Sequence, residues 1–281
     1  MAYSLYLIGS KARGDDNINS DVDYVCIYEN EKPKLNIDGG SISYYSLSRM
    51  RWMIENSKLF VMHLIREGEP LIEIKSHTNL LKNFSIKVSI LKKDQSDFIR
   101  AIQSLKWIPH GTPGIRWGCD YTYTLARNII YIENAIDGFY EFGYSNATRY
   151  FLEKKSLANL HSNFMNLREE KYQNRNGNLA PSEFSVVNLE SILSSLAGEL
   201  IVLKIGGESR ISCKGKFSYS KLRLLERAII NREISDENYL RILQNHGEYF
   251  FSIRQSALKL CHKLHARKNS GLGSYKKYDQ Q

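Results

Sequence analysis

Two short apolar runs near the N-terminus are separated by a polar loop, and the polar residues of that loop constrain the fold most. The runs are YSLYLI at 3–8 and VDYVCIY at 22–28, both rich in the β-branched and aromatic residues that favour strands. A Gly-Ser pair directly follows the first run, and Asp21 and Asp23 stand at the start of the second. Because side chains alternate faces along a strand, the two carboxylates are predicted to point the same way.

Two unpaired carboxylates on one side of a strand repel each other, and a divalent cation removes that repulsion. Magnesium prefers hard oxygen ligands, and it usually completes its coordination shell with water and substrate phosphates rather than with a closed protein cage. The sequence therefore predicts a magnesium site at Asp21 and Asp23 that phosphate oxygens complete.

The Gly-Ser pair is suited to phosphate. Gly9 lets the backbone approach a phosphate closely, and the Ser10 hydroxyl can donate a hydrogen bond to it. If the next residues form a helical turn, their N–H groups add anion affinity. Arg13 can add charge or hold the loop, and Gly14 permits a sharp turn. The pattern indicates phosphoryl transfer by positioning and charge neutralisation, and the alternative is a polar hairpin with a capped turn.

The run GSKARGDDNINSDVDYV resembles the signature of the DNA polymerase beta-like nucleotidyltransferase superfamily, in its small bacterial branch. That signature is Gly-Ser, then Ala-Arg-Gly-Asp/Glu, then Ser-Asp-x-Asp. The later run LFVMHLIREGEPL is similar, less specifically, to a segment of larger proteins of this branch. Nine positions in fifteen match the signature in type and spacing: Gly9, Ser10, Ala12, Arg13, Gly14, Asp15, Ser20, Asp21 and Asp23.

The resemblance implies a small mixed sheet flanked by helices, dependence on magnesium or manganese, and a nucleoside triphosphate as substrate. It implies transfer of a nucleoside monophosphate to a hydroxyl group with release of pyrophosphate. By position in the signature, Asp21 and Asp23 would be catalytic and hold the metal ions. The positions expected to bind the nucleotide are Gly9, Ser10, Arg13 and Ser20.

A third acidic residue is the point where this sequence departs from the pattern. Active members of the superfamily usually carry it on the next strand, where it helps to ligate the catalytic metal. In DGGSISYYS the expected register falls nearer Ser41 than an acid, and Asp38 would serve if the strand began sooner. Asp38 is therefore the candidate third catalytic residue, and without it only two metal ligands remain.

Local patterns predict the remaining elements. A third strand is expected at 41–46, a helix at 47–68 that Gly68 stops, and a further short strand in PLIEI. His63 and Glu67, four residues apart on that helix, are interpreted as a packed or surface helix pair, and the alternative is a functional role. The segment 171–182 is expected to be a loop. Further helices are predicted at 95–108, 120–142, 145–155, 188–206, 218–233 and 236–268.

The predicted fold class is α+β, a small mixed β-sheet nucleotidyltransferase module followed by a mainly α-helical domain. The catalytic domain is assigned to 1–90, the helical domain to 91–268 and a disordered tail to 269–281.

Composition narrows the function classes. The formal net charge of +9 favours an anionic partner such as nucleic acid or a nucleotide, and the alternative is a lysine-rich solvated surface. The four cysteines are scattered without a CxxC pair, which favours reduced thiols and a cytoplasmic location. No run of apolar residues is long enough for a membrane span, and no basic region precedes the first apolar run, so no signal peptide is expected.

The sequence thus predicts a cytoplasmic, metal-dependent nucleotidyltransferase. Its acceptor would be an RNA 3′ end such as that of tRNA, a protein side chain, or a small molecule such as an antibiotic. The resemblance alone makes a toxin–antitoxin or phage-defence setting plausible. The alternative is a catalytically degenerate protein that binds a nucleotide or a partner.

Overall fold

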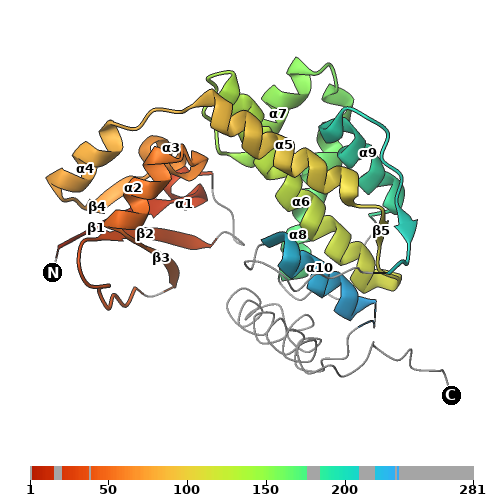
Figure 1. Cartoon of the computed structure of the whole chain (residues 1–281), viewed down its shortest axis with the longest axis horizontal. Coiled ribbons are helices and arrows are strands. Elements are labelled where there is room, and N and C mark those ends of the chain that lie inside the picture. Colours follow the sequence, from red (N-terminus) through yellow and green to blue (C-terminus); the bar gives the residue numbers. More distant parts are fainter. Residues whose placement is uncertain are drawn as a thin grey trace, which may run out of the picture. The chain divides into compact units, whose positions relative to one another are not determined.

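The chain folds into two compact units, each assembled from several segments. A computed structural model describes residues 2–15, 21–37, 39–175, 184–208, 219–231 and 233, and for 174–175 and 219–222 only the backbone. Neither unit is continuous in sequence. The predicted domain boundary at residue 90 therefore stays a prediction. The sheet unit draws on 1–102, 124–165 and 195–198, and the helical unit on 103–123, 166–194 and 199–281 (Figure 1).

The sheet unit contains a mixed sheet of four strands in the order β3-β2-β1-β4. β1 pairs antiparallel with both β2 and β4, whereas β2 and β3 run parallel. The predicted strands and the mixed sheet are confirmed. The strands are β1 (Tyr3–Ile8), β2 (Val22–Tyr28), β3 (Gly40–Ser46) and β4 (Glu69–Ile72).

Helices cover one face of this sheet. Figure 1 shows α2 and α3 lying over the strands. Every second residue of β2 points to these helices, so Val25 and Ile27 are fully buried against Met50, Val61 and Leu64. The same alternation places Asp23, two residues before Val25, at the end of the helix-covered face. The covering helices are α2 (Leu47–Glu55), α3 (Leu59–Glu67) and α4 (Lys75–Lys82).

The single helix predicted over 47–68 is wrong, because the chain breaks between α2 and α3. Ser57 has a φ of 46°, in the left-handed region, and its side chain is buried. The Ser57 hydroxyl accepts a hydrogen bond from the backbone N–H of Lys87 at 3.1 Å. The apolar residues continue at helical spacing through the break, so the local sequence gives no sign of this tertiary contact.

A buried histidine lies beneath β1. His77 of α4 is fully buried, and its Nδ1 lies 3.0 Å from the Ser4 hydroxyl oxygen, which also accepts from the Ile74 N–H at 2.9 Å. Nε2 lies 3.4 Å from a Glu29 carboxylate oxygen, which can only accept, so we assign the ring proton to Nε2 and Nδ1 as the acceptor of the Ser4 hydroxyl. Burial lowers the pKa of His77, and the neighbouring Glu29 carboxylate only partly offsets this.

Folding is therefore expected to weaken as the solution is acidified through the titration of His77. A lowered pKa in the folded state means that the unfolded chain binds the proton more tightly, so this contribution is complete above about pH 6.5 and is lost below it. Urea unfolding at pH 7.5 and pH 5.5 measures the effect. His77→Asn, which keeps an amide near Ser4 and cannot titrate, should show a smaller loss. An equal loss in both proteins would contradict the assignment.

Two helices beyond α4 begin well before their predicted first residues, α5 at Val88 and α6 at Gly111. Three helices end well before their predicted last residues. Helix 95–108 ends at Ser104, because Trp107 and Ile108 form β5, which pairs in parallel with β6 (Lys204–Ile205). Helix 120–142 ends at Ile136 and helix 188–206 at Ala197, each before a glycine with positive φ, Gly138 at 80° and Gly198 at 72°. The elements are α5 (Val88–Ser104), β5 (Trp107–Ile108), α6 (Gly111–Ile136), α7 (Tyr144–Lys154), η1 (Ala158–Leu160), α8 (His161–Arg175), α9 (Val186–Ala197) and α10 (Tyr219–Ile230).

Two helices were not predicted from the sequence, α4 and α8. The loop predicted at 171–182 begins inside α8, which continues to Arg175. The helix predicted at 236–268 and the tail at 269–281 lie outside the described residues.

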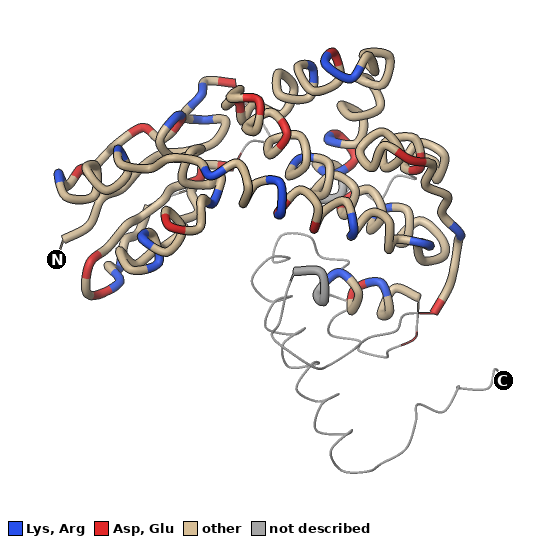
Figure 2. The backbone as a smooth tube through the Cα atoms, turned by 45° about the horizontal axis from the view of Figure 1, so that its top comes forward, with Lys and Arg blue, Asp and Glu red and all other residues tan. Residues whose placement is uncertain are grey.

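Charge is mixed along the described chain. Figure 2 shows Lys and Arg interspersed with Asp and Glu along the helices of both units. The described helices include none with the length and apolar character that crossing a membrane requires. The net positive charge therefore bears on the sign of a partner's charge but does not locate a binding face.

Candidate functional site

The Gly-Ser pair forms a tight turn between β1 and a four-residue helix, α1 (Ser10–Arg13). Gly9 has φ 79° and ψ −156°, a conformation that only glycine adopts without strain. The Arg13 N–H donates to the Gly9 carbonyl at 3.1 Å, and the Asp15 N–H donates to the Ser10 carbonyl at 3.1 Å. The residues after the glycine thus form a helical turn, which was the condition for added anion affinity, and Gly14 closes the turn at φ 72°.

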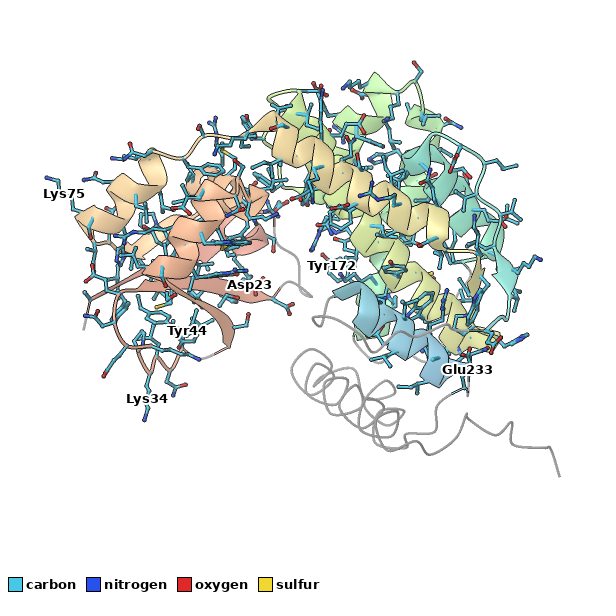
Figure 3. All side chains as sticks on the ribbon, viewed as in Figure 1. Asp23, Lys34, Tyr44, Lys75, Tyr172 and Glu233 are labelled. Atoms are coloured by element: carbon cyan, nitrogen blue, oxygen red, sulfur yellow. The ribbon has the colours of Figure 1, made fainter. Side chains whose placement is uncertain are left out.

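Asp23 faces this turn. It pairs with Ile8, the last residue of β1, so the start of β2 and the Gly9 turn lie at the same end of the sheet. A Cβ atom on Gly9 would lie 3.8 Å from Oδ2 of Asp23. Figure 3 labels Asp23 at this end of the sheet. Asp21 is exposed and directly precedes β2.

Ser41 occupies the position beside Asp23 on the next strand. The parallel pairing of β2 and β3 aligns Asp23 with Ser41, and the Ser41 hydroxyl donates to Oδ1 of Asp23 at 2.7 Å. The predicted register near Ser41 is confirmed. Asp38, the candidate third catalytic residue, and Ser20 both lie outside the described residues, so their roles stay predictions.

Three groups contact the Glu67 carboxylate. Arg13 donates from Nη1 to Oε2 at 2.6 Å, and His63 Nε2 lies 3.0 Å from the same oxygen. The backbone N–H of Phe142 donates to Oε1 at 3.1 Å. We call Arg13, His63, Glu67 and Phe142 the Glu67 cluster. The cluster joins the end of α1 to α3 and to the connection that precedes α7.

Charge pairing keeps Glu67 and Arg13 ionised. Burial alone would raise the pKa of Glu67, but hydrogen bonds from His63 and Arg13 hold it below its ordinary value. Burial likewise opposes the charge on Arg13, and the hydrogen bond and charge of Glu67 raise the pKa of Arg13 above its usual value. Arg13 also pairs with Asp15, from Nε to Oδ1 at 3.1 Å.

The connection between α6 and α7 lies tightly against the cluster. The Phe142 ring stacks on His63 with ring centroids 4.7 Å apart. A Cβ on Gly143 would lie 2.7 Å from Oε1 of Glu141 and 3.3 Å from Oδ2 of Asp15, so a larger residue there would force a shift. Sequence reasoning had not connected Glu67 or Phe142 with the turn, and the only local signal was the spacing of His63 and Glu67.

The aspartates of the candidate site suit a metal ion whose coordination shell is completed by substrate oxygens and water. Within the described ranges, no three His, Cys, Asp or Glu side chains gather closely enough to hold a metal ion between them. A pair of aspartates still fits magnesium, because phosphate oxygens and water supply the other positions. The residues that would hold it are Asp21 and Asp23.

In comparisons with known proteins, no family model, curated protein or solved structure matches the chain. The functional argument therefore depends on the residues of the site.

Proposed function

We propose that this chain is a magnesium-dependent nucleotidyltransferase that transfers a nucleoside monophosphate from a nucleoside triphosphate to a hydroxyl acceptor. The observation that carries the proposal is the approach of Asp23 to the Gly9 turn, with Oδ2 3.8 Å from where a Gly9 Cβ would be. A phosphate-binding turn and a metal-binding carboxylate at one end of a sheet are what a triphosphate site requires. The nine signature positions support the same assignment.

In this proposal the acceptor hydroxyl loses its proton to solvent as its oxygen forms a bond to the α-phosphorus. The bond from that phosphorus to the bridging oxygen breaks, and pyrophosphate leaves with the electron pair of that bond. The metal, when bound, neutralises charge on the phosphates. The Ser10 hydroxyl hydrogen-bonds a phosphate oxygen, and the Gly9 backbone leaves room for it. Asp21 and Asp23 are the residues that would hold this metal, whose positive charge would help to orient the triphosphate.

The acceptor is proposed to be a nucleic acid rather than a polycation. A site for an aminoglycoside antibiotic would need many carboxylates, whereas the chain carries a formal net charge of +9. An RNA 3′ end is therefore favoured over a small cationic drug, and a protein side chain stays the other acceptor class.

The assay for this proposal uses each α-labelled nucleoside triphosphate with magnesium, with bulk tRNA or cell lysate as acceptor. Label transferred to an acceptor, with pyrophosphate released, supports the proposal. Absence of transfer from all four nucleotides, with every acceptor fraction, would overturn it.

Ser41 favours a second candidate, a nucleotide-binding protein without turnover. The hydroxyl beside Asp23 stands where active members of the superfamily usually have a third carboxylate, and it engages Oδ1 at 2.7 Å. Nucleotide binding without label transfer would support this candidate.

Ser41→Asp distinguishes the two candidates. If only two carboxylates serve the metal, the added one should lower the magnesium concentration at half-saturation about tenfold, because ligand charge sets affinity. Without metal the variant should melt at a lower temperature than wild type, since like charges repel. Magnesium titrations in a thermal-shift assay with nucleotide present measure both effects.

Ser43→Asp is the matched control, since Ser43 is exposed on the same strand and pairs with Val25 instead of Asp23. Equal shifts in the two variants would show that general negative charge is responsible. No gain in Ser41→Asp would indicate that the metal site already has its third carboxylate.

A further inference from the structure

The short helix α1 lacks the means to hold itself in place. It has four residues, none of them buried, and glycines with positive φ flank it on both sides. A single helical turn fixes several dihedral angles for very few hydrogen bonds and is unstable alone. Something outside α1 must therefore hold the turn in its observed shape.

Arg13 links α1 to a distant element through a side-chain ion pair. Its guanidinium reaches Glu67 of α3, 54 residues away, at 2.6 Å. The backbone N–H of Arg13 also closes the turn onto the Gly9 carbonyl at 3.1 Å. Fixing the Arg13 side chain therefore restrains the backbone bond that shapes the turn.

Glu67 is well placed to provide this restraint. Its side chain is only 10% exposed, and α3 packs into the core of the sheet unit through Val61 and Leu64. The Phe142 N–H fixes the second carboxylate oxygen, Oε1, at 3.1 Å. Charge-assisted hydrogen bonds in a half-buried setting are among the stronger contacts that a carboxylate makes.

We propose that Glu67 is a positioning residue, which holds Arg13 and thereby keeps the turn from Gly9 to Gly14 in the shape that takes up a nucleoside triphosphate. This inference rests on the proposed function, which it deepens by assigning a role to a residue outside the signature. Glu67 touches no reacting atom in this account and acts through Arg13 alone.

Glu67→Gln separates the two tasks of the carboxylate. The glutamine oxygen can still accept from Phe142, while its amide presents N–H groups and no charge to Arg13. Hydrogen exchange of the Arg13 and Asp15 amides, which close the turn, should become about tenfold faster, as expected for loss of one charge-assisted contact. Exchange in the core of β2 should not change.

Nucleotide affinity gives a readout that a merely structural role would not move. The probes are magnesium and the non-hydrolysable α,β-methylene analogue of each nucleoside triphosphate. The dissociation constant of the best-bound analogue should rise about tenfold in Glu67→Gln and in Arg13→Ala. The double variant should show no further loss, because both changes remove the same contact.

Glu69→Gln is the matched control, since Glu69 is an exposed carboxylate two residues away on β4. It should leave both amide exchange and affinity as in wild type.

Unchanged exchange of the Arg13 and Asp15 amides in Glu67→Gln would overturn the inference, whatever the affinities are. Faster exchange with unchanged affinity would overturn it too, since Glu67 would then only stabilise the turn. A wild type that binds none of the analogues would instead overturn the proposed function, and the exchange experiment would still decide whether Glu67 holds the turn.

Discussion

Asp23→Ala is expected to abolish nucleotidyl transfer while the fold persists. The side chain is half-buried at the end of the sheet and accepts a hydrogen bond from the Ser41 hydroxyl at 2.7 Å. Loss of a group that fixes charge at the reacting phosphates costs about a thousandfold in rate. Loss of one partly exposed contact should move the melting temperature by less than about 2 °C.

The initial rate of label transfer and the thermal melt are measured on the same preparations. Asp23→Asn keeps the shape of the side chain and an oxygen for Ser41, so it isolates the charge and should lose as much activity as Asp23→Ala. Asp21→Ala should behave in the same way. Asp97→Ala removes an exposed aspartate of α5, which pairs with Lys93 at 3.4 Å, and should keep full activity.

Activity retained in Asp23→Asn would refute the metal assignment, because an amide cannot replace a carboxylate in charge. Activity lost together with the cooperative melt would show instead that Asp23 serves the fold. The combination of lost transfer and a retained melt is the outcome that the proposed mechanism requires.

The sheet and one half of the site were accessible from the sequence because they depend on local patterns. The strands β1 and β2 are short runs of β-branched and aromatic residues bounded by glycine or aspartate, and their observed bounds are those predicted. The resemblance placed the expected third acid near Ser41, and the pairing of β2 with β3 aligns Ser41 with Asp23. The register between paired strands is strongly specified, because a slip of one residue would turn the buried face of a strand outward.

The Glu67 cluster was not accessible, because it depends on contacts between distant segments. Arg13 and Glu67 are 54 residues apart, and Phe142 is a further 75 residues along the chain. The spacing of His63 and Glu67 is common on helices and identifies no partner. The break at Ser57 has the same cause, a hydrogen bond from a backbone group 30 residues away.

A second large effect is expected in the helical unit, where charge is buried. Arg223 and Glu226 of α10 are 2% and 1% exposed, and Arg223 Nη1 lies 2.6 Å from Glu226 Oε2. Arg223 also pairs with Asp120 at 2.7 Å and lies over the Trp117 ring, 5.7 Å from its centroid. Removing one member of such a pair takes a charged partner at 2.6 Å from the other, whose charge stays buried.

Arg223→Met should therefore lower the free energy of unfolding by roughly 3–5 kcal/mol, measured by urea denaturation with tryptophan fluorescence. The double variant Arg223→Met/Glu226→Leu should recover most of that loss, because apolar side chains of similar volume replace both charges. Asp120 is more exposed, so water can compensate its charge. If the double variant is no more stable than Arg223→Met, the stacking of Arg223 on Trp117 carries the stability instead of the ion pair, because stacking is the contact that both variants lack.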